Sequence, residues 1–426
     1  MTIRIKRRSQ AEWLLFYIFT LPFAFYLLMG ILSLPPMIKY TIDIAWVWLA
    51  FLIIVNRISI PNKESRIILR VVLLFIGSTI LGAIINVVSP IYYLWGFRNN
   101  VRFFVFFFSC ILFLKERNLE SYLKIFDNLF WVNFVLTLYQ FFVLGIKQDY
   151  LGGIFGVSIG CNSFTNIFLL IVITKSVLLC VHKKERLSTC LCKCAAALLV
   201  AALAELKVFF LEIAIVIVMA TWQGRPSARK LVIILLSALG AIVAIRVLVY
   251  LAPDFAEWFN WETIIETAAS DQGYTMSNDM NRLTAITMSW NRFLDSWVNK
   301  ILGFGLGSCD HSDSFSFLLT PFFKAHSELN YIWFSSAFLI LETGVVGLVL
   351  YFLLFICIFR YAGKCKKKYP EMLIYAKLSQ IMSVMCMIMI IYNSAMRTEA
   401  AYMAYFVLAL PFVRRESHNE KTNQPA

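Results

Sequence analysis

Long apolar stretches separated by short polar segments dominate the pattern of this sequence. The apolar runs are roughly 16–25 residues long, which is the length a helix needs to cross the hydrocarbon core of a bilayer. The runs do not alternate apolar and polar residues, so the pattern argues against a membrane β-barrel. Run length, combined with the positions of Lys and Arg in the intervening loops, predicts twelve helices. The expected ranges are 12–32, 37–56, 68–88, 101–115, 125–145, 161–181, 189–204, 208–223, 231–251, 330–360 (not one simple helix), 372–393 and 398–413.

One polar segment is much longer than the others and divides the chain into regions. The expected regions are an N-terminal membrane region at 1–251 with about nine helices, an external loop at 252–329, a C-terminal membrane region at 330–413 with about three helices, and a cytoplasmic tail at 414–426. Basic residues gather in loops such as 4–8, 183–186 and 364–368. Because cytoplasmic loops of membrane proteins are enriched in Lys and Arg, both termini are expected on the cytoplasmic side. The predicted fold class is all-α, a polytopic integral membrane protein.

Composition supports this class and narrows the chemistry. Hydrophobic residues make up 60% of the chain and charged residues 15%, and the mean hydropathy is +0.74. The net charge of +14 lies mainly in short loops on alternate sides of the expected helices, so it does not indicate a nucleic-acid partner. Cys190, Cys192 and Cys194 have no accompanying histidine pair, so buried or interfacial thiols are expected there rather than a zinc site. We therefore expect no metal and no other cofactor.

Three basic residues outside the long loop are candidates for binding a substrate. The apolar run around Glu205 and Lys207 is too long for one helix but fits two short helices that meet outside the membrane at that point. Lys207 is then either an anchor whose ammonium reaches the membrane surface or a ligand for phosphate. Arg98 and Arg102 are four residues apart at the outer start of a helix, which places both on one helical face.

The long loop contains the remaining candidates. Arg282 is a basic residue close to the returning chain, and His326 lies a few residues before the next apolar run. An imidazole at that place could accept a proton from a sugar hydroxyl at neutral pH, although a lone histidine is more often structural. His311 competes for the same role. The glycine-rich sequence GFGLG at 303–307 lacks the Lys-Ser/Thr of a nucleotide-binding loop, so we interpret it as a flexible turn after an amphipathic helix at 283–301.

Several of these segments together resemble a known family. Arg282 in NRLTAITMSW, the following KILGFGLGS, His326 in AHSELN and then LETGVVGLVLYFLLF are similar to the signature region of the O-antigen polymerase and O-antigen ligase superfamily. GFRNNVRFF, and LYQFFVLGIKQDYLGGIFG followed by Asn162 and Asn166, resemble bacterial polysaccharide polymerases. The resemblance extends from about residue 90 to 360, and its motifs are short and degenerate.

The resemblance implies a metal-independent, inverting glycosyltransferase of GT-C-like architecture in the bacterial cytoplasmic (inner) membrane, with its site on the external side. Its substrate would be an oligosaccharide on undecaprenyl pyrophosphate, and a chain-length regulator is a further candidate partner. In the family, basic residues bind the pyrophosphate and a loop histidine is the proposed base. Arg282 and His326 match these positions, and Lys207 stands where relatives tend to carry Arg.

The expected activity is polymerisation of O-antigen or capsular repeat units, because the 90–160 region looks more like polymerases. A ligase that moves finished polymer onto a lipid core is the alternative, and a polysaccharide flippase is a more distant one. A transporter usually places its charges midway along the spans around a central cavity, whereas the charges here cluster externally.

Overall fold

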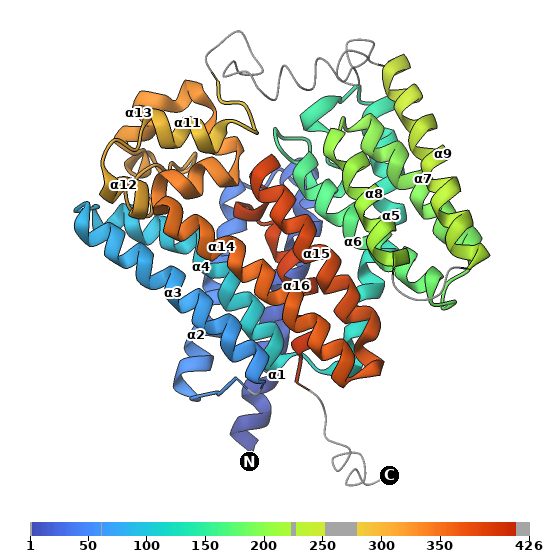
Figure 1. Cartoon of the computed structure of the whole chain (residues 1–426), viewed down its shortest axis with the longest axis horizontal. Helices are drawn as coiled ribbons and strands as arrows, with labels where there is room; N and C mark the ends of the chain where they lie inside the picture. The colour runs from blue at the N-terminus through green and yellow to red at the C-terminus, as the bar shows by residue number, and fades with distance from the viewer. Residues whose placement is uncertain (1, 61, 223–226, 252–278, 415–426) are drawn as a thin grey trace.

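The computed structural model describes residues 2–60, 62–222, 227–251 and 279–414, and every regular element in these ranges is helical (Figure 1). The helices are α1 (Thr2–Thr20), α2 (Thr41–Val55), α3 (Lys63–Ile85), α4 (Pro90–Phe113), α5 (Leu119–Phe142), α6 (Asn162–Val181), α7 (Leu187–Leu203), α8 (Lys207–Trp222), α9 (Ala228–Leu251), α11 (Ala285–Arg292), α12 (Trp297–Leu302), α13 (Pro321–His326), α14 (Ser335–Lys368), α15 (Leu373–Tyr392) and α16 (Ala401–Ala409). The sequence-based prediction of an all-α fold is confirmed for this part of the chain.

Within the described ranges, six helical segments are long and apolar enough to cross a membrane. They are Pro36–Val55, Lys63–Ile85, Pro90–Phe113, Asn162–Val181, Ser335–Lys368 and Pro370–Tyr392. Several of their apolar side chains face outward, such as Ile44 on α2, which is 75% exposed, and Leu74 on α3, which is 61% exposed. Outward-facing apolar residues of this kind are what a lipid-exposed helix carries. The chain is therefore a helical membrane protein.

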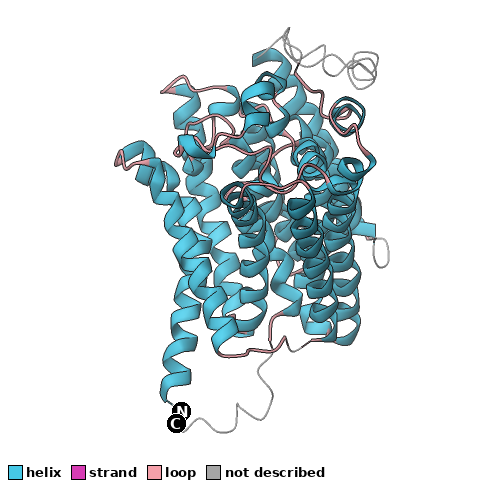
Figure 2. Ribbon diagram, turned by 90° about the vertical axis from the view of Figure 1, so that its left-hand side faces the viewer, coloured by secondary structure: helices cyan, strands magenta, loops and turns pink. Residues whose placement is uncertain are grey.

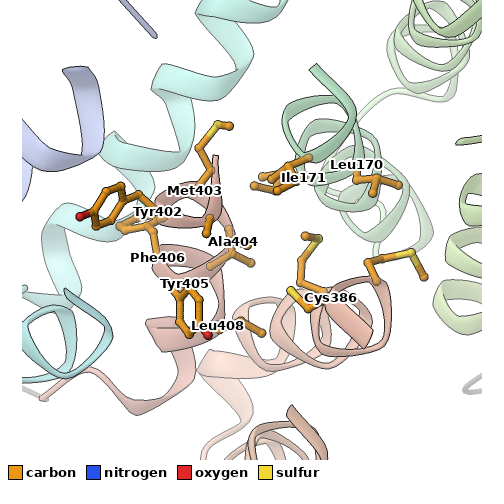
Figure 3. Close-up of a cluster of buried hydrophobic side chains, with 14 of the residues drawn as sticks. Leu170, Ile171, Cys386, Tyr402, Met403, Ala404, Tyr405, Phe406 and Leu408 are labelled. Carbon is orange, nitrogen blue, oxygen red and sulfur yellow. The ribbon is translucent and has the colours of Figure 1, made fainter. Parts of the chain in front are cut away.

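The centre of the helical body is built around the short helix α16. All nine residues of α16 are buried, and the helix packs against α4, α6 and α15. Figure 3 shows Ala404 of α16 on the side that faces Ile171 of α6 and Cys386 of α15. Aromatic contacts tie it to other helices as well, since the ring of Phe406 lies 4.6 Å from that of Phe19 and the ring of Tyr402 lies 4.9 Å from that of Phe103. α16 thus forms the core against which the longer helices are arranged.

Short helices and loops gather at one end of the long helices (Figure 2). Residues 279–329 are the described part of the loop that the sequence predicts to be external, and they are called the external segment below. They contain α11, α12 and α13, and α11 and α12 both pack against α14. The sequence predicted one amphipathic helix over 283–301, and this prediction is wrong in part. The helix breaks between Arg292 and Trp297, where Leu294 turns into the core and Ser296 caps α12 by accepting a hydrogen bond from the backbone N–H of Asn299 (3.0 Å). Residues 252–278 of the expected loop, and the tail beyond 414, lie outside the described residues.

The glycine-rich turn at 303–307 is tightly packed rather than flexible. Gly307 has φ +85°, and a Cβ at this position would lie 1.8 Å from the carbonyl oxygen of Tyr92. Gly344 interrupts the helical geometry of α14 at φ +61°, where a Cβ would lie 2.3 Å from the carbonyl oxygen of Ile301. Only glycine allows the backbone segments to approach this closely. The prediction that 330–360 is not one simple helix is confirmed at Gly344, whereas the flexible turn is not observed.

Buried Glu342 fixes the chain that follows this turn. Its Oε1 accepts a hydrogen bond from the backbone N–H of Cys309 at 3.0 Å, and Phe304 donates from its backbone N–H to the carbonyl of Leu341 at 2.8 Å. These bonds join the external segment to α14 immediately before its kink. The segment that carries Arg282, His311 and His326 is therefore held rigidly on the helical body.

Candidate functional site

Lys207 and Arg282 come from distant parts of the sequence, but Arg282 lies near enough to affect the pKa of Lys207. Lys207 is the first residue of α8, and Arg282 lies in the short segment before α11. Arg282 exerts the largest Coulombic effect on Lys207, ahead of the carboxylates of Glu205 and Asp149. Both side chains are half-buried. Two cations held together and partly removed from water favour the binding of an anion.

The pKa of Lys207 reflects this environment. Burial is the main cause that lowers it, repulsion by Arg282 lowers it further, and Glu205 and Asp149 oppose the shift. The result is a pKa of about 8, compared with 10.5 for an ordinary lysine. Burial also raises the pKa of the neighbouring carboxyl of Glu205. Lys207 is therefore an ammonium group that is costly to keep charged unless an anion accompanies it.

A tight turn between two short helices positions Lys207. α7 ends at Leu203, and Glu205 adopts a left-handed conformation with φ +54°. The backbone N–H of Leu206 then donates to the carbonyl of Ala201 at 2.8 Å, which closes α7 directly before α8 begins. The prediction that two short helices meet at this point is confirmed. Lys207 lies at the tip of this helical hairpin.

The segment that carries Asp149 is anchored by buried amide side chains of α5. Gln140 accepts from the backbone N–H of Gly153 at 2.8 Å and donates to the carbonyl of the same residue at 2.9 Å. Asn133 accepts from the backbone N–H of Ile154 at 3.0 Å. Asn162, at the start of α6, donates to Asp149 at 2.6 Å. These contacts hold the segment of Asp149 in place. Asp149 and Glu205 both favour the charged form of Lys207.

Arg282 is oriented by an aromatic ring. Its guanidinium carbon lies 4.1 Å from the ring centroid of Tyr392, the last residue of α15. The backbone N–H of Met280 donates to the carbonyl of Leu329 at 2.8 Å, which fixes the segment preceding Arg282. A stacked guanidinium loses little of its hydrogen-bonding capacity, because its N–H groups point outward in the plane of the group. Arg282 is thus held in place while still able to contact a ligand.

His326 belongs to the same part of the external segment. It ends α13, and three residues later Leu329 accepts the hydrogen bond from Met280. The imidazole is half-buried between the rings of Phe293 (5.0 Å) and Phe322 (4.8 Å). α13 begins because Pro321 follows Thr320, whose hydroxyl accepts from the backbone N–H of Phe323 at 3.3 Å. The prediction that His326 is a base stays open. Phe293 and Phe322 pack on its ring, and the hydrogen bond from Met280 to Leu329 brings the segment after His326 beside the segment before Arg282.

His311 is placed differently. Its ring stacks on Phe323 with centroids 4.1 Å apart and planes 4° from parallel, and its carbonyl accepts from the indole of Trp95 at 3.2 Å. Burial lowers the pKa of His311, although Asp310 and Asp313 act in the opposite direction. These contacts tie His311 to α13 and α4 and account for the residue structurally.

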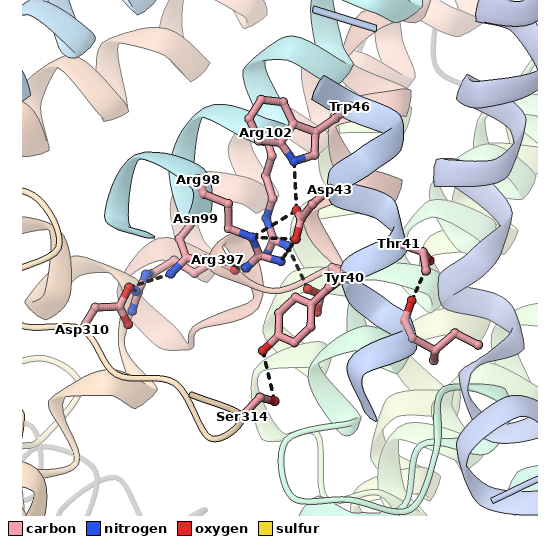
Figure 4. Close-up of polar contacts among 12 residues, drawn as sticks. Tyr40, Thr41, Asp43, Trp46, Arg98, Asn99, Arg102, Asp310, Ser314 and Arg397 are labelled. Atoms are coloured by element: carbon pink, nitrogen blue, oxygen red, sulfur yellow. Dashed lines mark hydrogen bonds and ion pairs between the residues drawn. The ribbon is translucent and has the colours of Figure 1, made fainter. Parts of the chain in front are cut away.

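Arg98 and Arg102 each have a carboxylate partner within the protein (Figure 4). Arg98 binds Asp43 through Nε (3.0 Å to each oxygen) and Nη2 (2.7 Å to Oδ2). Arg102 has a side chain that is 2% exposed, and it donates to Glu399 at 2.9 Å and to the carbonyl of Arg397 at 3.1 Å. The two arginines are four residues apart on α4, but their guanidiniums contact different partners on different elements.

Asp310 links this network to the external segment. It accepts from Asn99 at 2.7 Å and from Arg397 at 3.2 Å, and its own carbonyl accepts from Thr320 at 2.7 Å. Among the described residues, the ion pairs of this network join three arginines to three carboxylates: Arg98, Arg102, Arg397, Asp43, Asp310 and Glu399. Its charges balance, so it has no excess positive charge for an anionic ligand. We therefore interpret Arg98 and Arg102 as residues that hold α2, α4 and the external segment together, and we do not include them in the proposed ligand site.

No protein-family model matches this chain, and no curated protein is significantly similar to it. The resemblance of residues 90–360 to polysaccharide polymerases and ligases therefore stays a prediction from short motifs. Within the described ranges, no group of three or more His, Cys, Asp or Glu side chains is arranged to hold a metal ion. The candidate site is defined by the pair of Lys207 and Arg282, with His326 on the same part of the external segment.

Proposed function

We propose that this chain polymerises lipid-linked oligosaccharide repeat units of O-antigen or capsular type. The donor glycan would be carried on undecaprenyl pyrophosphate and transferred to a sugar hydroxyl of the acceptor. The protein would cross the bacterial cytoplasmic membrane twelve times in a GT-C-like arrangement, with the candidate site on the external side. The resemblance of its motifs to this family and the helical membrane fold support the proposal.

The proximity of Lys207 and Arg282 is the observation that carries this proposal. Lys207 was predicted as either an anchor at the membrane surface or a phosphate ligand, and Arg282 as a pyrophosphate ligand by resemblance to the family. In the fold, Arg282 lowers the pKa of Lys207. A pyrophosphate diester carries two negative charges, which match two cations. A site for one negative charge would not need a second cation. Holding Arg282 near Lys207 has an electrostatic cost, which is seen in the lowered pKa of Lys207.

The chemistry follows from the charge that develops on the leaving group. The acceptor hydroxyl oxygen attacks the anomeric carbon of the donor, and the bond from that carbon to the pyrophosphate oxygen breaks with inversion. Negative charge then increases on the departing pyrophosphate, where Lys207 and Arg282 would stabilise it. Fixed positive groups in a partly dry site can lower such a barrier by several kcal/mol, roughly 2.7–4 for a single donor group.

His326 is proposed to remove the proton from the acceptor hydroxyl. An imidazole nitrogen would take this proton as the new glycosidic bond forms and later release it to solvent. The ring has two aromatic neighbours, Phe293 and Phe322, which restrict its orientation. A base with one fixed orientation is favourable for catalysis because the acceptor has to approach along one direction.

The proposal can be tested by complementation in a host from which the gene has been deleted. The readout is the length distribution of the surface polymer per unit of membrane-inserted protein. Arg282→Ala should leave mainly single repeat units, and His326→Ala should lower the rate of extension by roughly 10²–10⁴-fold. Arg292→Ala is the matched control, since Arg292 is an exposed arginine of the same external segment.

Three other outcomes are informative. A normal polymer ladder from Arg282→Ala, with the protein present at its usual level, would contradict the proposed function of the site. In the deletion host without any added gene, full-length polymer that stays on the lipid carrier and is not transferred to the lipid core would identify the activity as that of a ligase. A dead His311→Gln variant beside an active His326→Ala variant would move the base to His311.

A further inference from the structure

A second group of basic side chains lies at the opposite end of the helices from the candidate site. Lys377 is in the second turn of α15, whereas Tyr392, which contacts Arg282, is the last residue of that helix. Fifteen residues of α-helix separate them, which corresponds to about 22 Å along the axis. His182 directly follows α6, which packs beside α15. The two clusters therefore cannot bind the same phosphate group.

Lys377 is buried, and within the part of the chain that the structure describes its ammonium contacts a histidine and no carboxylate. Its side chain is only 6% exposed, and its ammonium lies 3.1 Å from Nε2 of His182. The charged groups that act on Lys377 are Lys366 on α14 and Lys230 on α9, and both repel it. His182 is likewise acted on by Lys377, Lys184 and Lys230. Three helices, α9, α14 and α15, thus direct lysine side chains to one place, and Lys184 lies in the segment that follows α6.

His182 does not neutralise this charge. Burial lowers the pKa of His182, and repulsion by Lys377 lowers it further, so the ring is neutral at pH 7. A neutral imidazole can accept the hydrogen bond from Lys377 through Nε2 but supplies no negative charge. Buried ammonium groups are otherwise paired, because an isolated charge is costly to remove from water.

A neighbouring cluster at the same end of the protein contains buried lysines that are paired with carboxylates. Lys175 and Lys193 both pair with Asp127, and Lys193 also lies 3.0 Å from Glu185. Two buried ammonium groups are balanced there by two carboxylates. Cytoplasmic loops are enriched in lysine, which accounts for exposed residues such as Lys183 and Lys184. It does not account for Lys377, which is buried between packed helices.

We propose that Lys377, flanked by His182, Lys230 and Lys366, binds the phosphate of an anionic phospholipid headgroup. Lys377 lies four residues from the start of α15, about 6 Å along its axis, which is the depth of the headgroup region at the end of a membrane helix. Basic pockets between helices on the cytoplasmic side are suited to lipids of this class. The site is separate from the proposed glycosyl-transfer site and does not depend on that activity.

The test uses the purified full-length protein in detergent and measures its thermal unfolding temperature with added lipid. Phosphatidylglycerol should raise the wild-type unfolding temperature, and zwitterionic phosphatidylethanolamine should not. Lys377→Gln should lose most of this lipid-dependent rise and bind phosphatidylglycerol about tenfold more weakly, the loss expected for one charge-assisted contact. Lys377→Arg should retain the rise, because it keeps the charge.

Lys124→Gln is the matched control, since Lys124 is a lysine near the start of α5 that is 65% exposed and paired only with Glu120 on the helix surface. It should respond to phosphatidylglycerol like the wild type. If Lys377 only stabilises the fold through His182, Lys377→Gln will unfold at a lower temperature but show an unchanged lipid-dependent rise, which overturns the proposal. An equal, Lys377-dependent rise with inorganic phosphate would assign the site to soluble phosphate and overturn the lipid assignment.

Discussion

Binding of the lipid-linked donor should weaken as pH rises through about 8, and this weakening should depend on Lys207. The pKa of Lys207 is lowered to about 8, mainly by burial and then by repulsion from Arg282. Below this pH the side chain is an ammonium ion and attracts the pyrophosphate, and above it the side chain is a neutral amine. The charge of a pyrophosphate diester does not change between pH 6.5 and 9.5, so the protein is the source of the pH dependence.

The magnitude follows from the titration of one group. With a pKa of about 8, roughly nine-tenths of Lys207 is charged at pH 7 and roughly one-tenth at pH 9. If the charged form is the one that binds, the Kd for the donor should rise about tenfold across this range, which corresponds to about 1.4 kcal/mol. Tenfold is an upper limit, because a neutral amine still donates hydrogen bonds.

The assay is equilibrium binding of a short-chain, lipid-linked pyrophosphate analogue to purified protein at constant ionic strength, since salt screens these charges. Binding is measured rather than turnover, because His326 would add its own pH dependence to the rate. Lys207→Arg should flatten the profile, since arginine stays charged. Arg282→Ala should bind more weakly overall but move the midpoint to higher pH, because it removes the repulsion. Identical profiles for wild type and Lys207→Arg would refute the assignment of Lys207 to the donor site.

Three further predictions concern the fold that supports the site. A membrane-impermeant thiol reagent added to whole cells should label Ser316→Cys in the external segment and not Lys367→Cys, and labelling of both positions would contradict the proposed topology. Arg102→Ala should destabilise the protein by about 3–5 kcal/mol in thermal unfolding, because it leaves Glu399 buried without its partner; a loss below about 1 kcal/mol would show that the network is dispensable. Gly307→Ala should lower the amount of folded protein, whereas Gly77→Ala, where a Cβ meets no neighbour within 4 Å, should not.

The sequence was sufficient to predict the features that depend on residues close together in the chain, such as the positions and breaks of helices. Each of the twelve apolar ranges coincides largely with a helix, and the short hairpin at Glu205 follows from a run too long for one helix. The interruption near residue 344 also has a local cause, since Gly344 alone in α14 departs from helical geometry. The length of an apolar run and the position of a glycine are sufficient in these cases because each determines the backbone conformation of its own segment.

The partners of the charged residues could not be predicted in the same way. Arg102 pairs with Glu399, 297 positions later, and Arg98 pairs with Asp43, 55 positions earlier. No spacing rule within one helix reveals such pairs. A usable signal did exist, because Arg397 and Glu399 lie in a short polar segment between two apolar runs and require partners at that depth. Matching them with the arginines of α4 would have separated structural from ligand-binding cations.

The contrast between the two groups of cations explains why the candidate site lies where it does. Arg102 is almost fully buried and shares a network in which three carboxylates balance three arginines, so its charge contributes to holding helices together. Lys207 and Arg282 are half-buried, and Arg282, which lies over Tyr392 at the end of α15, disfavours the charged form of Lys207. An anion that binds near both cations offsets the repulsion that Arg282 exerts on Lys207. The free energy released on binding is then largest for a ligand with two adjacent negative charges, which is the property that distinguishes a pyrophosphate from a single phosphate diester.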